Sequence, residues 1–301
     1  MRVVLVSSVE FLLGCSSDAA ALASSDGGAG DAEVPDSGKK TDGAIDTGTM
    51  CSLATNTTAT TTVTSECTLV TRDVSSCQAL RMSQGLGGAW LNFSCRVALT
   101  KSGSNVTVGA DSQPDYKSNY FSSTDACYTK YTTTFPDPNS ISAQTLSMSI
   151  PLSPSTTGQA MGFGVVGVAI NGVEIFDNVA APGDDIFLEA GSFDPCQGHP
   201  APGGRYHYHA EPYSISSNDS NLIGVMRDGY FIYGRLDKDG TVPTLDTNGG
   251  HTSATPDSTT AVYHYHVNLQ TSTAPATVGT KAWFLTTGTY KGAPGTCTGC
   301  N

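Results

Sequence analysis

The sequence has little charge, and basic charge is especially scarce. Only 14% of its 301 residues are Asp, Glu, Lys or Arg, whereas about a quarter is usual for a soluble domain. The 15 Lys and Arg residues are dispersed and the net charge is −12, which argues against a protein that binds nucleic acid through its phosphates. Ser, Thr and Gly take the place of charged residues, and this composition favours a β-rich protein outside the cytoplasm.

Long apolar runs and regular helical patterns are also missing. No stretch approaches the ~20 consecutive apolar residues that cross a membrane as a helix, and no long segment repeats apolar residues every 3.6 positions. The sequence contains no P-loop, dinucleotide fingerprint or nucleophile elbow. We therefore predict an all-β fold, sandwich-like or barrel-like, with few short helices. No motif decides whether the protein is an enzyme.

The first 15 residues resemble an export signal. Arg2 precedes an apolar run over Val3–Leu13, and the ending Leu-Leu-Gly-Cys resembles a bacterial lipobox. This pattern predicts a lipoprotein signal peptide over residues 1–15, lipidation of Cys15, and an exported protein anchored at the outer membrane or cell surface. A membrane contact is expected through this anchor alone. Glu10 interrupts the run, which leaves an ordinary signal peptide or a wrongly assigned start codon as alternatives.

Two further segments precede the histidine-bearing part of the chain. Residues 16–50 are almost all Ser, Asp, Gly, Ala and Thr, so we expect a disordered tether. Residues 51–110 are expected to form a disulfide-containing β region, which the sequence does not show to be a separate domain. Its strands are predicted at Thr61–Val70, Trp90–Leu99 and Val106–Val108, with a turn between the last two.

Eight cysteines remain after Cys15, which is an even number. In an exported protein this predicts up to four disulfides, whose connectivity the sequence leaves open. Cys297 and Cys300 have the spacing of a redox motif but no βαβ pattern around them. We predict a structural disulfide between them, with thiol chemistry or metal binding as alternatives. The other six are Cys51, Cys67, Cys77, Cys95, Cys127 and Cys196.

All six histidines belong to one repeated pattern. The tetrapeptide Tyr-His-Tyr-His occurs at 206–209 and again at 263–266, and one further histidine, His199 or His251, stands before each copy. Side chains alternate between the two faces of a strand. The two histidines of each tetrapeptide are therefore expected on one face and the two tyrosines on the other.

Other motifs recur in nearly the same register. Residues 167–176 and 224–233 share the pattern Gly-Val-x-x-(Asn/Asp)-Gly-x-x-Ile-aromatic, displaced by the same 57 positions as the tetrapeptides. This indicates an internal duplication of a hairpin–loop–strand unit, about 167–209 and 224–266. The Asn-Gly and Asp-Gly dipeptides predict tight type I′ hairpin turns. Between hairpin and tetrapeptide, each unit carries Asp followed by a Gly-His pair, with the aspartates at Asp194 and Asp246.

The repeated histidines predict a metal site. Each unit offers three imidazoles, and a set drawn from both units is the alternative. Imidazole-rich sets without sulfur suit copper or zinc. Asp194 and Asp246 are expected as further ligands or as partners that orient an imidazole. A sheet core stabilised by stacked Tyr and His side chains, without metal, is the structural alternative. The imidazoles are His199, His207, His209, His251, His264 and His266.

Other residues support different functions. Tyr208 and Tyr265 are candidate acids or bases of a metal-free enzyme that acts on an extracellular polymer, with Arg205 or Arg227 on an anionic group. A non-catalytic surface binding module is a third hypothesis, and the sequence identifies no substrate or protein partner. Residues 237–240, Asp-Lys-Asp-Gly, resemble the start of a calcium loop, but later ligand positions lack carboxylates and a plain turn is predicted.

The segments around these motifs carry a family resemblance. Residues 193–212, 223–234 and 245–267 closely resemble the YHYH domain family of exported bacterial proteins, and residues 167–175 and 283–292 are similar to its opening and closing segments. The resemblance covers roughly residues 110–295. It implies export, a β-rich domain over residues 111–301 and important histidines, and it implies no reaction.

Overall fold

The computed structural model describes residues 66–181 and 184–300. They belong to one compact unit, Lys40–Asn301. The expected signal peptide, Cys15, the tether and Cys51 lie outside the described residues. None of the described helices is long and apolar enough to span a membrane.

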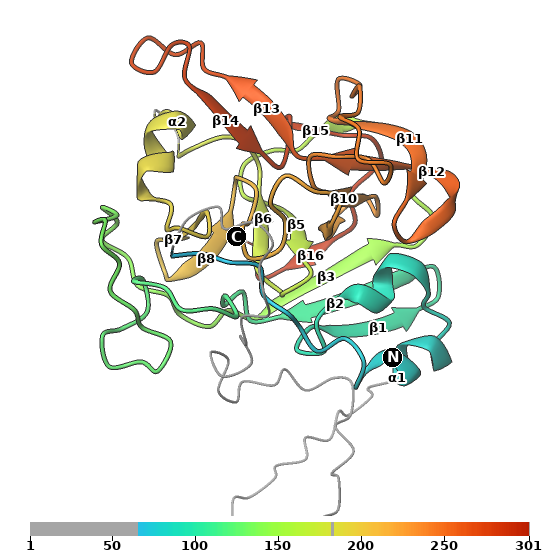
Figure 1. The fold of residues 1–301 in the computed structure, drawn as a ribbon. Helices are drawn as coiled ribbons and strands as arrows, with labels where there is room; N and C mark the ends of the chain where they lie inside the picture. The colour runs from blue at the N-terminus through green and yellow to red at the C-terminus, as the bar shows by residue number, and fades with distance from the viewer. Residues whose placement is uncertain (1–65, 182–183, 301) are drawn as a thin grey trace, which may run out of the picture. The chain divides into compact units, whose positions relative to one another are not determined.

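The fold is all-β, as the sequence predicts, and the helices are short (Figure 1). The helical elements are α1 (Gln78–Ser83), η2 (Gly88–Asn92), α2 (Ile186–Glu189) and η3 (Ala190–Ser192). The strands are β1 (Ala98–Ser102), β2 (Asn105–Ala110), β3 (Leu146–Pro151), β4 (Gln159–Ala160), β5 (Val165–Ala169), β6 (Glu174–Phe176), β7 (Gly198–Ala201), β8 (Arg205–Tyr208), β9 (Leu222–Met226), β10 (Phe231–Tyr233), β11 (Gly250–Thr255), β12 (Ser258–His266), β13 (Asn268–Thr271), β14 (Lys281–Phe284), β15 (Thr289–Tyr290) and β16 (Cys297–Thr298).

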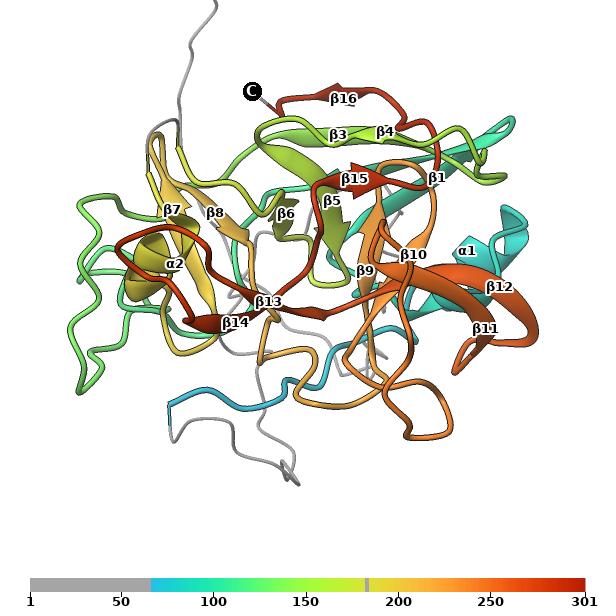
Figure 2. The same cartoon turned by 90° about the horizontal axis from the view of Figure 1, so that it is seen from above.

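An eight-stranded sheet forms the centre of the fold, in the order β11-β12-β10-β9-β5-β6-β8-β7. Its two halves, β5 to β8 and β9 to β12, follow the same order outward from the middle. In each half a hairpin is followed by one parallel pairing and one antiparallel edge pairing. The halves meet where β5 and β9 pair antiparallel, with Val168 opposite Val225. Figure 2 shows β7 and β8 on one side of this junction and β11 and β12 on the other.

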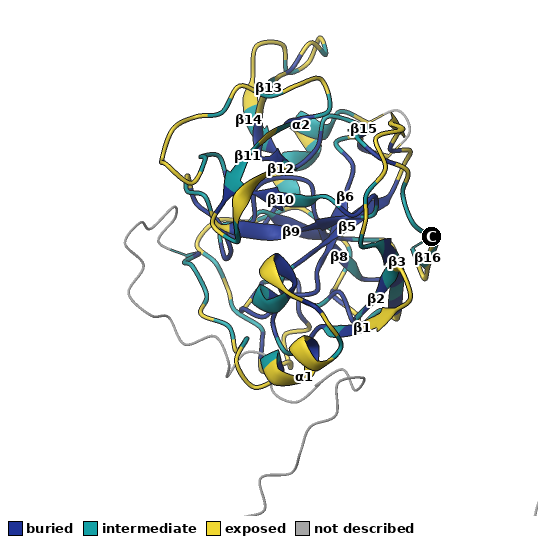
Figure 3. Ribbon diagram, turned by 90° about the vertical axis from the view of Figure 1, so that its right-hand side faces the viewer, coloured by how far each residue is buried: buried dark blue, intermediate teal, exposed yellow. Residues whose placement is uncertain are grey.

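A second sheet, β1-β2-β3-β16, covers one face of the central sheet. Leu99, Val106 and Met148 from the small sheet share one apolar cluster with Val168 and Val225 from β5 and β9. The two sheets therefore form a sandwich, and β5 and β9 lie buried within it (Figure 3). Residues 98–110 share this core, so the predicted β region packs directly on the histidine-bearing sheet.

The opposite face of the central sheet packs on loops and aromatic side chains. Tyr206, Tyr208 and Tyr265 from the two tetrapeptides lie in this second apolar cluster together with Ile175 and Ile232. All five side chains are buried. The central sheet is thus covered on both faces, which explains why strands such as β5 and β9 are apolar throughout.

The hairpin turns differ from the predicted type I′ turns. Asn171 and Asp228 do not take positive φ, whereas Gly172 and Gly229 do. The Gly172 amide donates to the Ala169 carbonyl, and the turn at Gly229 is closed in the same way. Each loop therefore has three residues and ends on a glycine in the left-handed region. The expectation failed because the Asn171 and Asp228 side chains turn inward to hydrogen bond on the tyrosine face.

The strand predicted at Trp90–Leu99 is wrong over most of its length. Residues 88–92 form η2, and β1 begins only at Ala98. The buried Arg81 guanidinium donates to the carbonyl oxygens of Phe93, Ser94 and Val97. These carbonyls are therefore unavailable to a neighbouring strand. The predicted strand at Val106–Val108 is confirmed within β2, and of the one predicted at Thr61–Val70, the described part holds only a single bridge.

Three disulfides join described residues. Cys77 bonds Cys95 and stabilises the loop before β1, while Cys67 bonds Cys196 across 129 positions. The predicted disulfide between Cys297 and Cys300 is confirmed. Cys127 is disulfide-bonded as well. Disulfides of this number are typical of proteins in oxidising compartments, which is consistent with export.

Candidate metal centres

The strand pairing brings the histidines to the face that the small sheet covers. Parallel pairing sets Glu174 beside His207 in one half and Tyr233 beside His266 in the other. The His207 ring stacks on Phe176 of β6 at a centroid distance of 3.8 Å. Because side chains alternate, the tyrosines of the same strands point to the other face. The predicted separation of histidine and tyrosine is thus observed.

His199, His207 and His209 form the first imidazole group. Antiparallel pairing of β7 and β8 sets His199 opposite His207. The Nε2 atom of His207 lies 3.0 Å from that of His199 and 2.9 Å from that of His209. The Nδ1 atom of His199 faces the Ser192 hydroxyl at 2.8 Å and an Asp137 carboxylate oxygen at 3.3 Å. Three buried imidazoles therefore point one nitrogen each at a common centre.

Backbone carbonyls fix the orientation of two of these rings. His207 Nδ1 lies 3.0 Å from the Arg205 carbonyl oxygen, and His209 Nδ1 lies 2.5 Å from that of Asp177. A carbonyl oxygen only accepts, so both Nδ1 atoms carry the proton. In the neutral rings both Nε2 atoms therefore present lone pairs to each other. Such an arrangement is unfavourable unless a cation lies between them, and it is the orientation by which proteins prepare histidine for metal binding.

A proton is a poor occupant of this centre. Burial, together with the neighbouring imidazoles of His199 and His209, lowers the pKa of His207 well below its usual value. Burial also lowers the pKa of His209 to about 3, and His199 acts in the same direction. Both shifts favour the neutral imidazole, which is the form that coordinates a metal ion.

The second imidazole group consists of His251, His264 and His266 together with Asp237. The two strands β11 and β12 set His251 opposite His264. The Oδ1 atom of Asp237 lies 3.0 Å from His251 Nε2, 3.8 Å from His264 Nε2 and 3.6 Å from His266 Nε2. The four possible ligand atoms of this group all lie within 4.8 Å of one another. The possible ligand atoms of the described residues thus form two separate groups rather than one.

The rings of the second group are oriented as in the first. His264 Nδ1 lies 2.9 Å from the Val262 carbonyl oxygen, and His266 Nδ1 lies 2.7 Å from that of Gly234. The Nε2 atom of His266 is buried and has no hydrogen-bond partner. Burial lowers the pKa of His266 to about 4. A cation held by Asp237 and the three imidazoles would satisfy this nitrogen.

Asp237 was missed by the sequence-based prediction of ligands. Its segment forms the predicted turn, in which the Gly240 amide donates to the Asp237 carbonyl. The turn holds the carboxylate over β11, where the Ser253 hydroxyl also donates to Oδ1 at 3.0 Å. No equivalent carboxylate occurs in the first unit, so the repeat carried no signal for it.

Asp194 and Asp246 lie away from both imidazole groups. Asp194 accepts hydrogen bonds from the Tyr206 hydroxyl and from two amides of its own loop. Asp246 accepts the equivalent bonds from Tyr263 and from its loop. Both carboxylates therefore fix the loop to the tyrosine face. Neither touches an imidazole, so neither contributes a ligand atom to the described groups.

The Gly-His motif has a packing explanation. A Cβ atom on Gly198 would lie 2.5 Å from the Tyr206 ring, and one on Gly250 would lie 2.5 Å from the Tyr263 hydroxyl oxygen. Each glycine thus makes room for the first tyrosine of its tetrapeptide. The residue after it is thereby held opposite the first histidine.

The candidate catalytic tyrosines are buried on the face opposite the histidines. The Tyr208 hydroxyl lies 3.0 Å from that of Tyr116 and accepts from the Asn171 amide at 3.1 Å. Tyr265 donates to Asp228 at 2.5 Å. Burial raises the pKa of both Tyr208 and Tyr265. A tyrosine and a histidine of the same strand therefore do not meet in one site.

Both candidate arginines take part in internal contacts. Arg205 forms an ion pair with the buried Glu174 at 2.5 Å. Arg227 donates to the carbonyl oxygens of Gly295 and Val165. Both guanidinium groups therefore bind other parts of this protein, which argues against either of them as the binding group for an anionic substrate.

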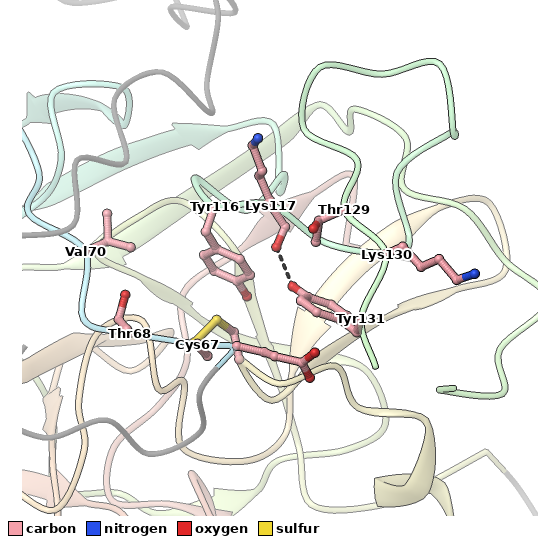
Figure 4. A pocket seen from close by; sticks show the side chains of 10 residues that line it. Cys67, Thr68, Val70, Tyr116, Lys117, Thr129, Lys130 and Tyr131 are labelled. Carbon is pink, nitrogen blue, oxygen red and sulfur yellow. Dashed lines mark hydrogen bonds between the residues drawn. A yellow bond between two sulfur atoms is a disulfide. The ribbon is translucent and has the colours of Figure 1, made fainter. Parts of the chain in front are cut away.

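Pockets occur on both sides of the sheet. The first imidazole group lies in the wall of a cavity of about 630 Å³. Another, of about 430 Å³, lies beside the disulfide of Cys67 and reaches Tyr116 (Figure 4). There the Tyr131 hydroxyl donates to the Lys117 carbonyl, while the Lys117 and Lys130 side chains extend away from the disulfide.

The fold and the site define a class: an all-β, disulfide-bonded protein whose central sheet carries two imidazole groups. Residues 147–244 match the model of the family described as YHYH protein. The match includes the first tetrapeptide and supports the resemblance to that family, and the second tetrapeptide lies outside it. Comparisons with the curated proteins and with the solved structures gave no match.

Proposed function

We propose that this protein binds two transition-metal ions, one at each imidazole group, and that the ions are copper or zinc. The observation that supports this most is the pair of Nε2 atoms of His207 and His209, 2.9 Å apart with both Nδ1 protons committed to carbonyls. Directing two lone pairs at one point costs stability without a cation. The binding of a cation between these nitrogens would offset that cost.

The choice of copper or zinc follows from the ligand types. Both groups offer imidazole nitrogens, the second adds a carboxylate, and neither includes sulfur among its described ligand atoms. Such sets suit Zn²⁺ and Cu²⁺ among the divalent metals. Bound copper would support metal handling or electron transfer, whereas zinc with an open position would support water activation.

The proposed location is outside the cytoplasm. The disulfides support an oxidising compartment. Lipidation of Cys15 and anchoring at the outer membrane or cell surface complete the proposal. Labelling with a palmitate analogue, compared between the wild-type precursor and Cys15→Ala, tests the anchor; equal labelling of both would refute it.

Metal analysis tests the main proposal. Protein purified without a His-tag, then loaded with Zn²⁺ or Cu²⁺ and dialysed, should retain two equivalents. His207→Ala and His264→Ala should each retain one, and the double variant none. Tyr131→Phe, which changes a residue outside both groups, serves as the control and should retain two. Retention of fewer than about 0.2 equivalents by correctly folded wild-type protein, with no uptake on titration, would refute metal binding.

A further inference from the structure

The two imidazole groups differ in what surrounds them. In the second group the Asp237 carboxylate lies within 3.0 to 3.8 Å of all three Nε2 atoms. Three nitrogens and one oxygen make four ligands, the number that fills a structural zinc site. The first group offers three nitrogens and no carboxylate within its set of ligand atoms.

Asp137 lies on the Nδ1 side of His199, and the carboxylate on its Nε2 side is Glu189, at the end of α2. Its Oε1 atom lies 3.7 Å from His199 Nε2, and its Oε2 atom is buried without a hydrogen-bond partner. Glu189 is not one of the ligand atoms that lie within 4.8 Å of one another in the first group, so it lies beside the centre rather than in it. A metal ion held by the three imidazoles would keep a position for an exogenous ligand, with Glu189 next to that position.

The open side of the first group faces the cavity of about 630 Å³. Its lining is mostly apolar and includes Phe163, Val179 and Leu188, three of the large apolar side chains that stay exposed on the described surface. Exposed apolar side chains that converge on one cavity favour a ligand that covers them. The second group differs, because Asp237 already occupies the side that an added ligand would take in the first group.

The negative charge of the cavity lining disfavours anionic ligands. Asp137, Asp184, Asp185 and Glu189 contribute carboxylates to the lining. Neither Lys nor Arg is found among the described residues that line it. An anionic ligand would meet this negative field without a compensating cation other than the metal itself.

We propose that the two centres have different tasks. The second is a closed structural centre, and the first binds, at its open position, an uncharged or cationic molecule that carries a nitrogen donor and an apolar group. This proposal rests on metal binding at the first group. It assigns the cavity as the site of a small apolar ligand.

Spectroscopic titration tests the proposal. Protein loaded with Co²⁺, a spectroscopic substitute for Zn²⁺, is titrated with 4-phenylimidazole, imidazole and benzoate while the visible absorption is followed. We expect 4-phenylimidazole to change the spectrum at a concentration about ten-fold lower than imidazole, because the phenyl group gains apolar burial. Benzoate should cause no change over the same range. His264→Ala should respond like the wild type, and His207→Ala should not respond.

Two matched variants test the cavity itself. Leu188→Ser should bring the half-saturating concentration of 4-phenylimidazole close to that of imidazole. Leu269→Ser removes another exposed leucine, which lies outside the cavity, and should leave the preference intact. Glu189→Gln should retain the response to 4-phenylimidazole.

The possible failures are distinguishable. No retained Co²⁺ would refute metal binding and the proposed function with it. Two retained equivalents with an unchanged spectrum would overturn only the open centre, and recovery of the response in Glu189→Gln would identify Glu189 as a closing ligand. Binding of benzoate as strongly as 4-phenylimidazole, or a response lost in His264→Ala but kept in His207→Ala, would also overturn the proposal.

Discussion

Val168 pairs with Val225 at the centre of the eight-stranded sheet. Val225 follows Val168 by 57 positions, which is also the offset between the two Tyr-His-Tyr-His strands. An antiparallel pair of equivalent residues places a local twofold axis between them. The strand order on either side repeats accordingly, which is the arrangement that an internal duplication would produce. The two imidazole groups consequently lie in separate halves of the sheet.

This central pairing depends on small residues, so we predict that Gly224→Ala destabilises the fold. A Cβ atom at Gly224 would clash with the carbonyl oxygen of Val168. Both partners are backbone in the middle of the sheet and cannot move aside, so the free energy of unfolding should fall by about 2–3 kcal/mol. Urea denaturation measures this. Gly87→Ala is the control, because a Cβ there meets nothing within 4 Å. Equal stability of the two variants would contradict the prediction.

The tyrosines of the tetrapeptides should contribute to stability and not to metal binding. Tyr265→Phe removes a hydroxyl that donates to Asp228 and accepts from the Lys291 amide. Leaving these buried groups unsatisfied should cost about 1–3 kcal/mol. Metal content should remain two equivalents, because the hydroxyl faces away from the histidines. Loss of one equivalent in folded Tyr265→Phe would show that the tyrosine acts on the metal centre.

The sequence carried part of this site and not the rest. The alternation of side chains along a strand was sufficient to predict that His207 and His209, two positions apart, share a face. The repeats suggested Asp194 and Asp246 as ligands, because each precedes a Gly-His pair. The sequence alone does not show which other side chains contact these aspartates. Only the three-dimensional structure shows that each binds the tyrosine of the same unit. Asp237 has no counterpart in the other unit, so repetition could not identify it.

Two disulfides should differ sharply in their effect on stability. The bond between Cys67 and Cys196 spans 129 positions, whereas that between Cys297 and Cys300 spans three. In the chain-entropy description, closing the long loop stabilises the fold by about 4 kcal/mol or more and the short loop contributes much less. Replacing both cysteines of the first pair by serine should therefore lower the melting temperature well beyond the same change in the second pair. Calorimetry under oxidising conditions measures both, and an equal loss would contradict the loop-length explanation.

The role of Asp237 leads to the most discriminating prediction for the second centre. Asp237→Asn keeps the side-chain volume but removes the charge that faces three Nε2 atoms. A neutral amide is a weaker ligand than a carboxylate, so the affinity of this centre should fall by at least ten- to a hundred-fold. Asp239→Asn is the matched control, since Asp239 lies two positions along the same turn and bonds only to Thr241.

These variants are best compared in a His207→Ala background, which leaves only the second centre to bind metal. Competition against a chromophoric chelator then reports its affinity directly. If Asp237→Asn and Asp239→Asn bind equally well, Asp237 orients His251 without coordinating the ion, and the second centre is as open as the first. If only Asp237→Asn loses affinity, the carboxylate closes the centre, and the contrast between a closed and an open site becomes a property of the two halves of one sheet.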